Sequence, residues 1–339
     1  MADMQQNNNG TDTEGRIDWV DIAKALGLFL VFLGHTLYGG SHIANVLNRA
    51  IYSFHMPMFF ILSGYVTKPD STTFKDYIKK KFKRLLLPAI LLYLLALPIY
   101  FAFYHNWSDP TLLMPVIKRI FYIKGECVFN KPVWFFFCLF QILVLIKLFN
   151  LPNAKTIKLL IVGSCSLLLS WFFYTSAWGY FKLFGFDKCV LGLFFYLCGM
   201  ILRKTKYNKY IFIIGLLLLP IWLYFGVSLN PKVRMYDMYL CNFWFFVISG
   251  ITGSLCFFSI SKCFDSLKNI GFIKEYAKWT VFIVGSHYVV VIGFHQIMTK
   301  FSLGHTYVFD IACLCFVILS LAIYKPICRW LEKHFSILI

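Results

Sequence analysis

The sequence predicts an all-α integral membrane protein, a bundle of about ten transmembrane helices with both termini in the cytoplasm. Three observations lead to this fold class. Of the 339 residues, 59% are hydrophobic and 14% are charged, whereas charged residues make up about a quarter of an ordinary soluble protein. Apolar segments of membrane-spanning length follow one another along the chain. The basic residues lie mostly in short stretches between these segments, so the net charge of +18 indicates membrane topology and not nucleic-acid binding.

The amino terminus differs in composition from the rest of the chain. Residues 1–15 are polar and lack the basic region and cleavage site of a secretory signal. We expect a disordered tail there, followed by a single transmembrane domain over residues 16–339. The 11 cysteines lie mostly in apolar segments and have no spacing typical of a disulfide framework or a metal site.

Each predicted helix is an apolar segment of roughly the length that crosses the hydrocarbon core of a bilayer. Pro88 and Pro220 lie within two of them, which a bundle tolerates because neighbouring helices satisfy the freed backbone groups. In chain order the ten segments are residues 18–38, 49–66, 85–104, 133–149, 157–174, 189–202, 210–225, 239–261, 278–298 and 306–325.

The distribution of basic residues predicts the orientation of the bundle. An even number of spans places both termini on one side. With the termini inside, 22 Lys and Arg residues fall in the inner segments and ten in the outer loops. The positive-inside rule therefore favours cytoplasmic termini, as in a multi-pass protein of the plasma (inner) membrane.

The first predicted helix carries three ionisable residues on one face. At 100° per residue, Lys24 and His35 lie about 20° apart around the axis, and Asp21 lies about 40° from His35. His35 lies roughly 16 Å beyond Lys24 along the helix. Such residues in membrane helices are usually functional, because their burial in hydrocarbon is costly. The stripe suits a ligand with an anionic head at the inner surface, although an interfacial Asp21–Lys24 pair and a structural His35 would also produce it.

A basic run, KKKFKR at residues 79–84, precedes the third predicted helix. Such a run is typical of a topology signal or of a contact with lipid phosphates. It also suits the phosphates of a soluble cofactor. The second predicted helix contains His55, on its outer half, and Ser63, at its inner end.

These residues resemble the membrane-bound acyltransferase-3 family, and the resemblance extends over nearly the whole chain. Lys24 and Lys81 occupy positions that are more often Arg in the family, and Ala25 replaces a usual Gly. A lysine supplies the positive charge without the two-pronged geometry of arginine. The matching strings are DIAK (21–24), GH (34–35), FHMPMFF (54–60), SGY (63–65), RLLLP (84–88), PVWF (132–135), FYLCG (195–199), and Thr280 with His287.

The resemblance implies an integral-membrane O-acyltransferase of the bacterial cell envelope. Such an enzyme moves an acyl group, usually acetyl, from cytoplasmic acyl-CoA to a sugar hydroxyl of a surface polysaccharide or a lipid-linked saccharide. Acetyl-CoA is then a donor substrate, and we expect no tightly bound cofactor and no metal. The expected partners are acyl-CoA, the sugar acceptor and membrane lipids, but no nucleic acid.

Roles follow for the candidate residues. His35 is the candidate general base, and an acyl-His intermediate at the same residue is the alternative. Asp21 is expected to fix Lys24 and to act on His35 only indirectly. The expected CoA-binding residues are Lys24, Lys81 and Arg84, with Ser63 along the path of the pantetheine arm, and the expected acceptor-binding residues are His55, His287 and Trp134.

A transporter or exporter of polysaccharide or lipid-linked saccharide is the competing function class, because it also places ionisable residues inside a helical bundle. The aligned Lys24 and His35 and the basic run favour the enzyme. A transporter would more often show inverted halves with interrupted helices, and no convincing pair is evident. Within the enzyme class, a succinyl or longer acyl donor and an acceptor other than a sugar stay open.

Overall fold

A computed structural model describes residues 18–104, 130–176, 185–205, 208–265 and 271–335 of the chain. The tail predicted for residues 1–15 lies outside these ranges. Within them the chain is helical and forms no strand, apart from one isolated bridge between Arg234 and Tyr239. The predicted all-α fold is therefore confirmed for the described part of the chain.

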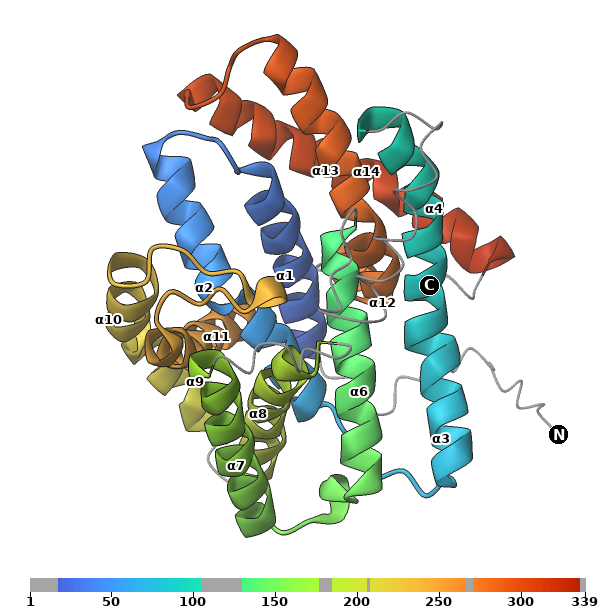
Figure 1. Cartoon of the computed structure of the whole chain (residues 1–339), viewed down its shortest axis with the longest axis vertical. Helices are drawn as coiled ribbons and strands as arrows, with labels where there is room; N and C mark the ends of the chain where they lie inside the picture. Colours follow the sequence, from blue (N-terminus) through green and yellow to red (C-terminus); the bar gives the residue numbers. More distant parts are fainter. Residues whose placement is uncertain (1–17, 105–129, 177–184, 206–207, 266–270, 336–339) are drawn as a thin grey trace, which may run out of the picture.

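The helices form one bundle with α1 (Asp18–Thr36) at its centre (Figure 1). A π-helical turn, η1 (Phe82–Leu86), joins the helix before it and the helix after it, α3 (Phe74–Lys81) and α4 (Leu87–Tyr104), into one long rod. The other elements are α2 (His42–Tyr65), η4 (Lys131–Val133), α6 (Trp134–Leu148), η5 (Leu151–Asn153), α7 (Thr156–Thr175), α8 (Phe186–Lys204), α9 (Asn208–Leu217), α10 (Leu219–Trp222), η7 (Leu223–Ser228), η8 (Met235–Asp237), α11 (Phe243–Asp265), α12 (Gly271–Lys278), α13 (Thr280–Lys300) and α14 (Tyr307–His334).

Every predicted segment coincides with a helix or with a run of consecutive helical elements, but fewer meet the criteria for a membrane span. In the described residues, seven helices are long and apolar enough to cross a membrane. Neither α2 nor α8 is among them, since polar residues are scattered along α2 and charged residues lie at both ends of α8. The count of ten and the cytoplasmic termini stay predictions.

Two glycines let α2 and α8 approach closely. A Cβ atom added at Gly64 would overlap the carbonyl oxygen of Tyr196, and one added at Gly199 would overlap the carbonyl oxygen of Ile61. Small residues at such positions are how membrane helices bring their backbones into contact. This contact fixes α2, which carries two of the candidate site residues.

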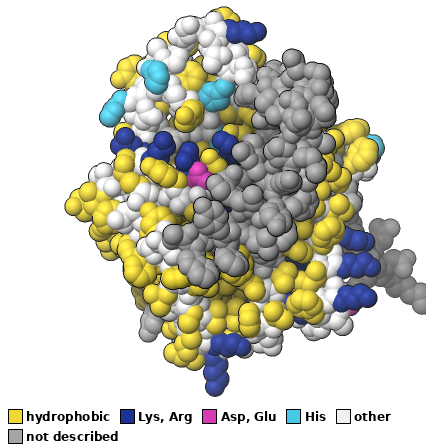
Figure 2. All heavy atoms as spheres, viewed as in Figure 1, with side chains coloured by type: hydrophobic (Ala, Val, Ile, Leu, Met, Phe, Trp, Pro, Cys, Tyr) yellow, Lys and Arg dark blue, Asp and Glu magenta, His cyan; other side chains and the backbone are white. Residues whose placement is uncertain are grey.

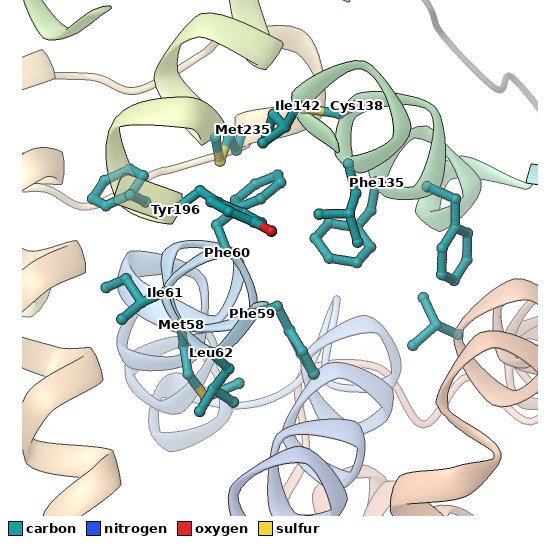
Figure 3. Packing of buried hydrophobic residues seen from close by; sticks show 14 of the residues in the cluster. Met58, Phe59, Phe60, Ile61, Leu62, Phe135, Cys138, Ile142, Tyr196 and Met235 are labelled. Carbon is teal, nitrogen blue, oxygen red and sulfur yellow. The ribbon is translucent and has the colours of Figure 1, made fainter. Parts of the chain in front are cut away.

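Aromatic side chains fill the space between α2, α6 and α8. Phe59 and Phe60 of α2 face Phe135 of α6, and Tyr196 of α8 lies beside Phe60 (Figure 3). The ring centroids of Phe60 and Phe135 are 5.0 Å apart. Aromatic pairs at this separation add stabilisation beyond the area that they bury. They therefore hold α6 against the C-terminal half of α2.

The turn that follows His35 is anchored to the last helix. Asp310 of α14 accepts hydrogen bonds from the backbone N–H of Ser41 at 3.0 Å and from its hydroxyl at 2.5 Å. The Ser41 hydroxyl also caps α2 by accepting from the N–H groups of Ile43 and Ala44. This network fixes the end of α1 and the start of α2 relative to each other.

Candidate active site

His35 lies one residue before the end of α1, where α1, α2 and α13 meet. Its Nδ1 atom is 3.0 Å from the hydroxyl oxygen of Tyr52 on α2. The imidazole ring lies edge-on to Tyr288 of α13, with centroids 5.2 Å apart, and 5.3 Å from the ring of His287. Side chains from two neighbouring helices, α2 and α13, therefore hold the His35 ring in one place.

The hydrogen bond to Tyr52 determines what the other nitrogen of His35 can do. A tyrosine hydroxyl can donate or accept, and a neutral imidazole has one donor and one acceptor nitrogen. When Nδ1–H donates to Tyr52, Nε2 carries the free lone pair and can accept a proton from a substrate. Tyr52 is in this sense a positioning residue for a base at Nε2.

Two cavities meet at His35. One has a volume of about 620 Å³ and the other, narrower one about 40 Å³. Four residues line both: His35, Tyr52, Lys131 and Tyr236. The larger cavity is also lined by Tyr38, Arg234, Tyr288, Val291, Ile292, His295, Gln296, Met298, Thr299, His305 and Phe309. The narrow one is also lined by Val31, His55, Met56, Phe59, Pro132, Trp134, Phe135, Met235, Thr280 and Val284.

The larger cavity is lined by cations and tyrosines. The Lys131 ammonium nitrogen lies 5.3 Å from the ring centroid of Tyr236 and 5.9 Å from that of Tyr288. Arg234 pairs with Asp237 at 3.0 Å. Burial raises the pKa of the Tyr236 hydroxyl, so this group stays protonated at neutral pH and can donate a hydrogen bond. Figure 2 shows a row of Lys and Arg side chains on one face of the molecule, with histidines above it.

Two of the three predicted acceptor-binding residues line the narrow cavity together with His35, and the third packs against its ring. His55 is buried, lines the narrow cavity, and donates from Nδ1 to the Ile51 carbonyl at 2.8 Å. Trp134, the first residue of α6, is buried and lines the same cavity. His287 lines neither cavity. Its Nδ1 lies 3.0 Å from the Ile283 carbonyl, and its buried Nε2 has no hydrogen-bond partner among the described residues.

The Asp21–Lys24 pair lies toward the opposite end of α1. The Lys24 ammonium is 3.5 Å from an Asp21 carboxylate oxygen, and the Asp21 side chain is buried. Fourteen residues of helix separate Asp21 from His35, a rise of about 21 Å. Asp21 therefore contacts Lys24 and is too far away to orient the His35 ring, as the sequence predicts.

The basic pair Lys81 and Arg84 straddles the start of η1. Lys81 is half-buried, with its ammonium 5.3 Å from the ring centroid of Tyr77, whereas Arg84 is exposed. Turns of π-helix are frequent at functional sites. Figure 2 shows Lys and Arg side chains gathered on the face where Figure 1 places α3.

Lys147 and Asp70 lie at the same end of the bundle as this basic pair. Lys147 of α6 lies 5.2 Å from the ring centroid of Tyr77 and donates to the backbone carbonyls of Asp70 and Thr72. Hydrogen bonds from the Thr72 hydroxyl and backbone N–H hold the pKa of Asp70 below its ordinary value. The Ser63 hydroxyl donates to the Phe59 carbonyl at 2.8 Å and lines neither cavity.

Sequence reasoning missed four of the residues around His35: Tyr52, Lys131, Arg234 and Tyr288. One signal was available for the two cations. Both belong to the minority of basic residues that the predicted topology places in outer loops, against the positive-inside trend. No signal in the sequence brings Tyr52 or Tyr288 to His35, because only the packing of α2 and α13 does so.

In the described residues, no group of three or more His, Cys, Asp or Glu side chains is placed to hold a metal ion.

Apolar helices around a histidine between two cavities define the class: a multi-pass membrane protein with a site inside its helix bundle. Comparison with known families then shows which one. The acyltransferase domain of the acyltransferase-3 family matches residues 17–325, and the chain belongs to this family. The family supports an acyltransferase activity in the membrane. Neither the comparison with curated proteins nor that with solved structures found a match.

Proposed function

We propose that this acyltransferase is an O-acetyltransferase of the bacterial plasma (inner) membrane. It moves an acetyl group from cytoplasmic acetyl-CoA to a sugar hydroxyl of a surface polysaccharide or lipid-linked saccharide. The observation that carries the proposal is the position of His35, which lies where two cavities meet on a helix whose other end carries the Asp21–Lys24 pair.

In the proposed reaction, His35 acts as a general base through Nε2. The sugar hydroxyl gives its proton to Nε2 as its oxygen attacks the thioester carbonyl carbon. The C–S bond then breaks, the ester C–O bond remains, and the leaving thiolate takes the proton from the imidazolium. In the variant with an acyl-His intermediate, Nε2 first attacks the thioester carbonyl carbon, the C–S bond breaks, and CoA leaves as the thiolate. The sugar oxygen then attacks the acyl carbon, the C–N bond to Nε2 breaks, and the hydroxyl proton passes to the thiolate.

The donor is proposed to bind from the end of α1 that carries Lys24. Lys24, Lys81 and Arg84 would hold the CoA phosphates, because ammonium and guanidinium groups are the usual partners of phosphate. Asp21 would keep Lys24 in position, and the pantetheine arm would pass Ser63 on its way to His35. The two ends of this path are separated by roughly 16 Å of helix rise between Lys24 and His35.

The acceptor is proposed to enter through the larger cavity. His35 and Tyr52 line this cavity, so a hydroxyl bound there can reach Nε2. Trp134 and His55 would shape the narrow cavity on the other side of His35, where the acetyl group is placed. His287 packs against the His35 ring and would keep it from turning away.

The test is mass spectrometry of surface glycans from cells with the intact protein, without it, and with His35→Ala. We expect the mass increment of an acetyl group only with the intact protein. His42→Ala is the matched control, because His42 is exposed and lines neither cavity. Unchanged glycan chemistry with a lower amount of glycan at the surface would instead identify a transporter.

A further inference from the structure

The larger cavity has the chemistry of a carbohydrate site. Its volume of about 620 Å³ lies within the range of ligand pockets. Tyr38, Tyr52, Tyr236 and Tyr288 line it. A tyrosine offers an apolar ring face and a hydroxyl that donates and accepts. This combination suits a sugar ring, which presents C–H groups on its faces and hydroxyls around its edge.

The charged groups on the cavity wall are cations. Lys131 and Arg234 line it, and no Asp or Glu occurs among the described residues of the wall. Lys131 lies over two tyrosine rings and has no carboxylate within ion-pair distance in the described part of the chain. Lys131 is half-buried, and an anionic partner stabilises a cation that is partly removed from water. An anionic group of a ligand in this cavity can therefore pair with the Lys131 ammonium.

Arg234 has an ion-pair partner but is not fully hydrogen-bonded among the described residues. Asp237 contacts its terminal nitrogen at 3.0 Å, but Nε is buried without a hydrogen-bond partner among the described residues. The guanidinium also lies 5.9 Å from the ring centroid of Tyr236. The Lys131 ammonium lies near the same ring. The two cations thus lie 5.3 Å and 5.9 Å from the centre of the same ring, so an anionic ligand that packs against Tyr236 lies in a positively charged environment.

Lys131 connects this charge to the reacting centre. It lines both cavities, as His35 does. An anion held by Lys131 would therefore lie in the same cavity as the hydroxyl that faces His35.

We propose that the acceptor is an anionic glycan, in which a carboxylate or phosphate on the sugar binds Lys131 and Arg234 while the tyrosines pack against the ring. The inference rests on the proposed function and narrows its acceptor. The donor phosphates remain assigned to the opposite end of α1.

The test uses the full-length protein in nanodiscs with acetyl-CoA labelled in the acetyl group. The acceptor is surface glycan from the producing cells, freed of ester-linked acyl groups and supplied in three forms: untreated, carboxyl-reduced and dephosphorylated. We expect one of the two treatments to lower transfer about tenfold or more, since a hydrogen bond to a charged group contributes on that scale. Which treatment does so identifies the anion.

Lys131→Gln and Arg234→Gln should each lower transfer to the untreated glycan about tenfold and leave transfer to the neutral form unchanged. Retained transfer to the neutral form shows that the variants fold. Lys232→Gln is the matched control, because Lys232 lies in the same loop as Arg234 but is exposed and does not line the cavity.

Three results would overturn the inference. Equal transfer by the intact protein to all three forms would remove the anionic acceptor and leave the proposed function standing. A higher KM for acetyl-CoA in Lys131→Gln, with the acceptor KM unchanged, would assign the cavity to the donor. No transfer to any form would remove the proposed function itself, and with it this acceptor.

Discussion

At the scale of single residues, the hydrogen bond between Tyr52 and His35 decides how the imidazole can act. The two atoms are 3.0 Å apart, and Tyr52 lies on a different helix from His35. The sequence identifies His35 because it shares a stripe with Asp21 and Lys24. It does not identify Tyr52, since the pairing depends on how α1 and α2 are joined by the turn that Asp310 anchors.

Tyr52→Phe is expected to lower kcat about tenfold, the upper range for loss of a neutral hydrogen bond. The ring still fills its place, but nothing fixes the tautomer and orientation of His35. The KM values for donor and acceptor should stay the same, because the ring of residue 52 still packs against the acceptor and the lost hydroxyl is the one engaged by His35. Steady-state kinetics of the reconstituted protein checks this, with Tyr307→Phe, an exposed tyrosine away from both cavities, as control. A changed KM with unchanged kcat would make Tyr52 a binding residue.

At the scale of helices, the apolar runs predicted most elements, and the errors have physical reasons. The second predicted segment begins at Arg49, whereas α2 begins at His42. The first turns of α2 mix polar and apolar residues, and the Ser41 cap that stabilises them has no signal in a hydropathy profile. The last helix continues from the predicted end, Lys325, to His334, with Arg329 and Lys325 paired to Glu275 of α12. The short helix α12 was not predicted, because it is amphipathic and too short to span.

The contact between α2 and α8 predicts a sharp difference between two glycines. Gly64→Ala should destabilise the protein by about 1–3 kcal/mol or more, because the new methyl group meets the Tyr196 backbone and the helices must separate. Gly293→Ala should have little effect, since a Cβ there has nothing within 4 Å. Thermal unfolding of the purified variants, followed by intrinsic fluorescence, measures both. Equal melting temperatures would show that α2 and α8 do not pack in this way.

The basic pair at η1 is the element-scale test of the donor site. The double variant Lys81→Ala, Arg84→Ala should raise the KM for acetyl-CoA about tenfold, through loss of charge-assisted contacts with phosphate, and leave kcat unchanged. Lys155→Ala with Lys158→Ala removes the same charge from exposed residues before and within the first turn of α7 and serves as control. An unchanged donor KM in the first variant would restrict these residues to topology.

At the scale of the whole molecule, the orientation of the bundle is the main prediction from sequence that the fold itself does not test. The two ends of α11 provide a direct way to examine it. Cys241 is exposed just before α11, and Cys263 is exposed near its far end. The charge distribution places the first outside the cell and the second inside.

Single-cysteine variants should therefore differ in their reaction with a membrane-impermeant maleimide. In intact cells we expect labelling of Cys241 and not of Cys263, and labelling of both after permeabilisation. Labelling of Cys263 alone in intact cells would invert the orientation and place the larger cavity on the cytoplasmic side.

The central claim is that His35 transfers the acyl group between a donor and an acceptor that approach it from opposite directions. The most direct measurement follows label from acetyl-labelled acetyl-CoA into de-O-acylated surface glycan, using protein reconstituted in nanodiscs, for the intact protein and for His35→Ala. We predict transfer by the intact protein and none by the variant, with equal binding of acetyl-CoA by both. Transfer by His35→Ala at the rate of the intact protein would contradict the claim.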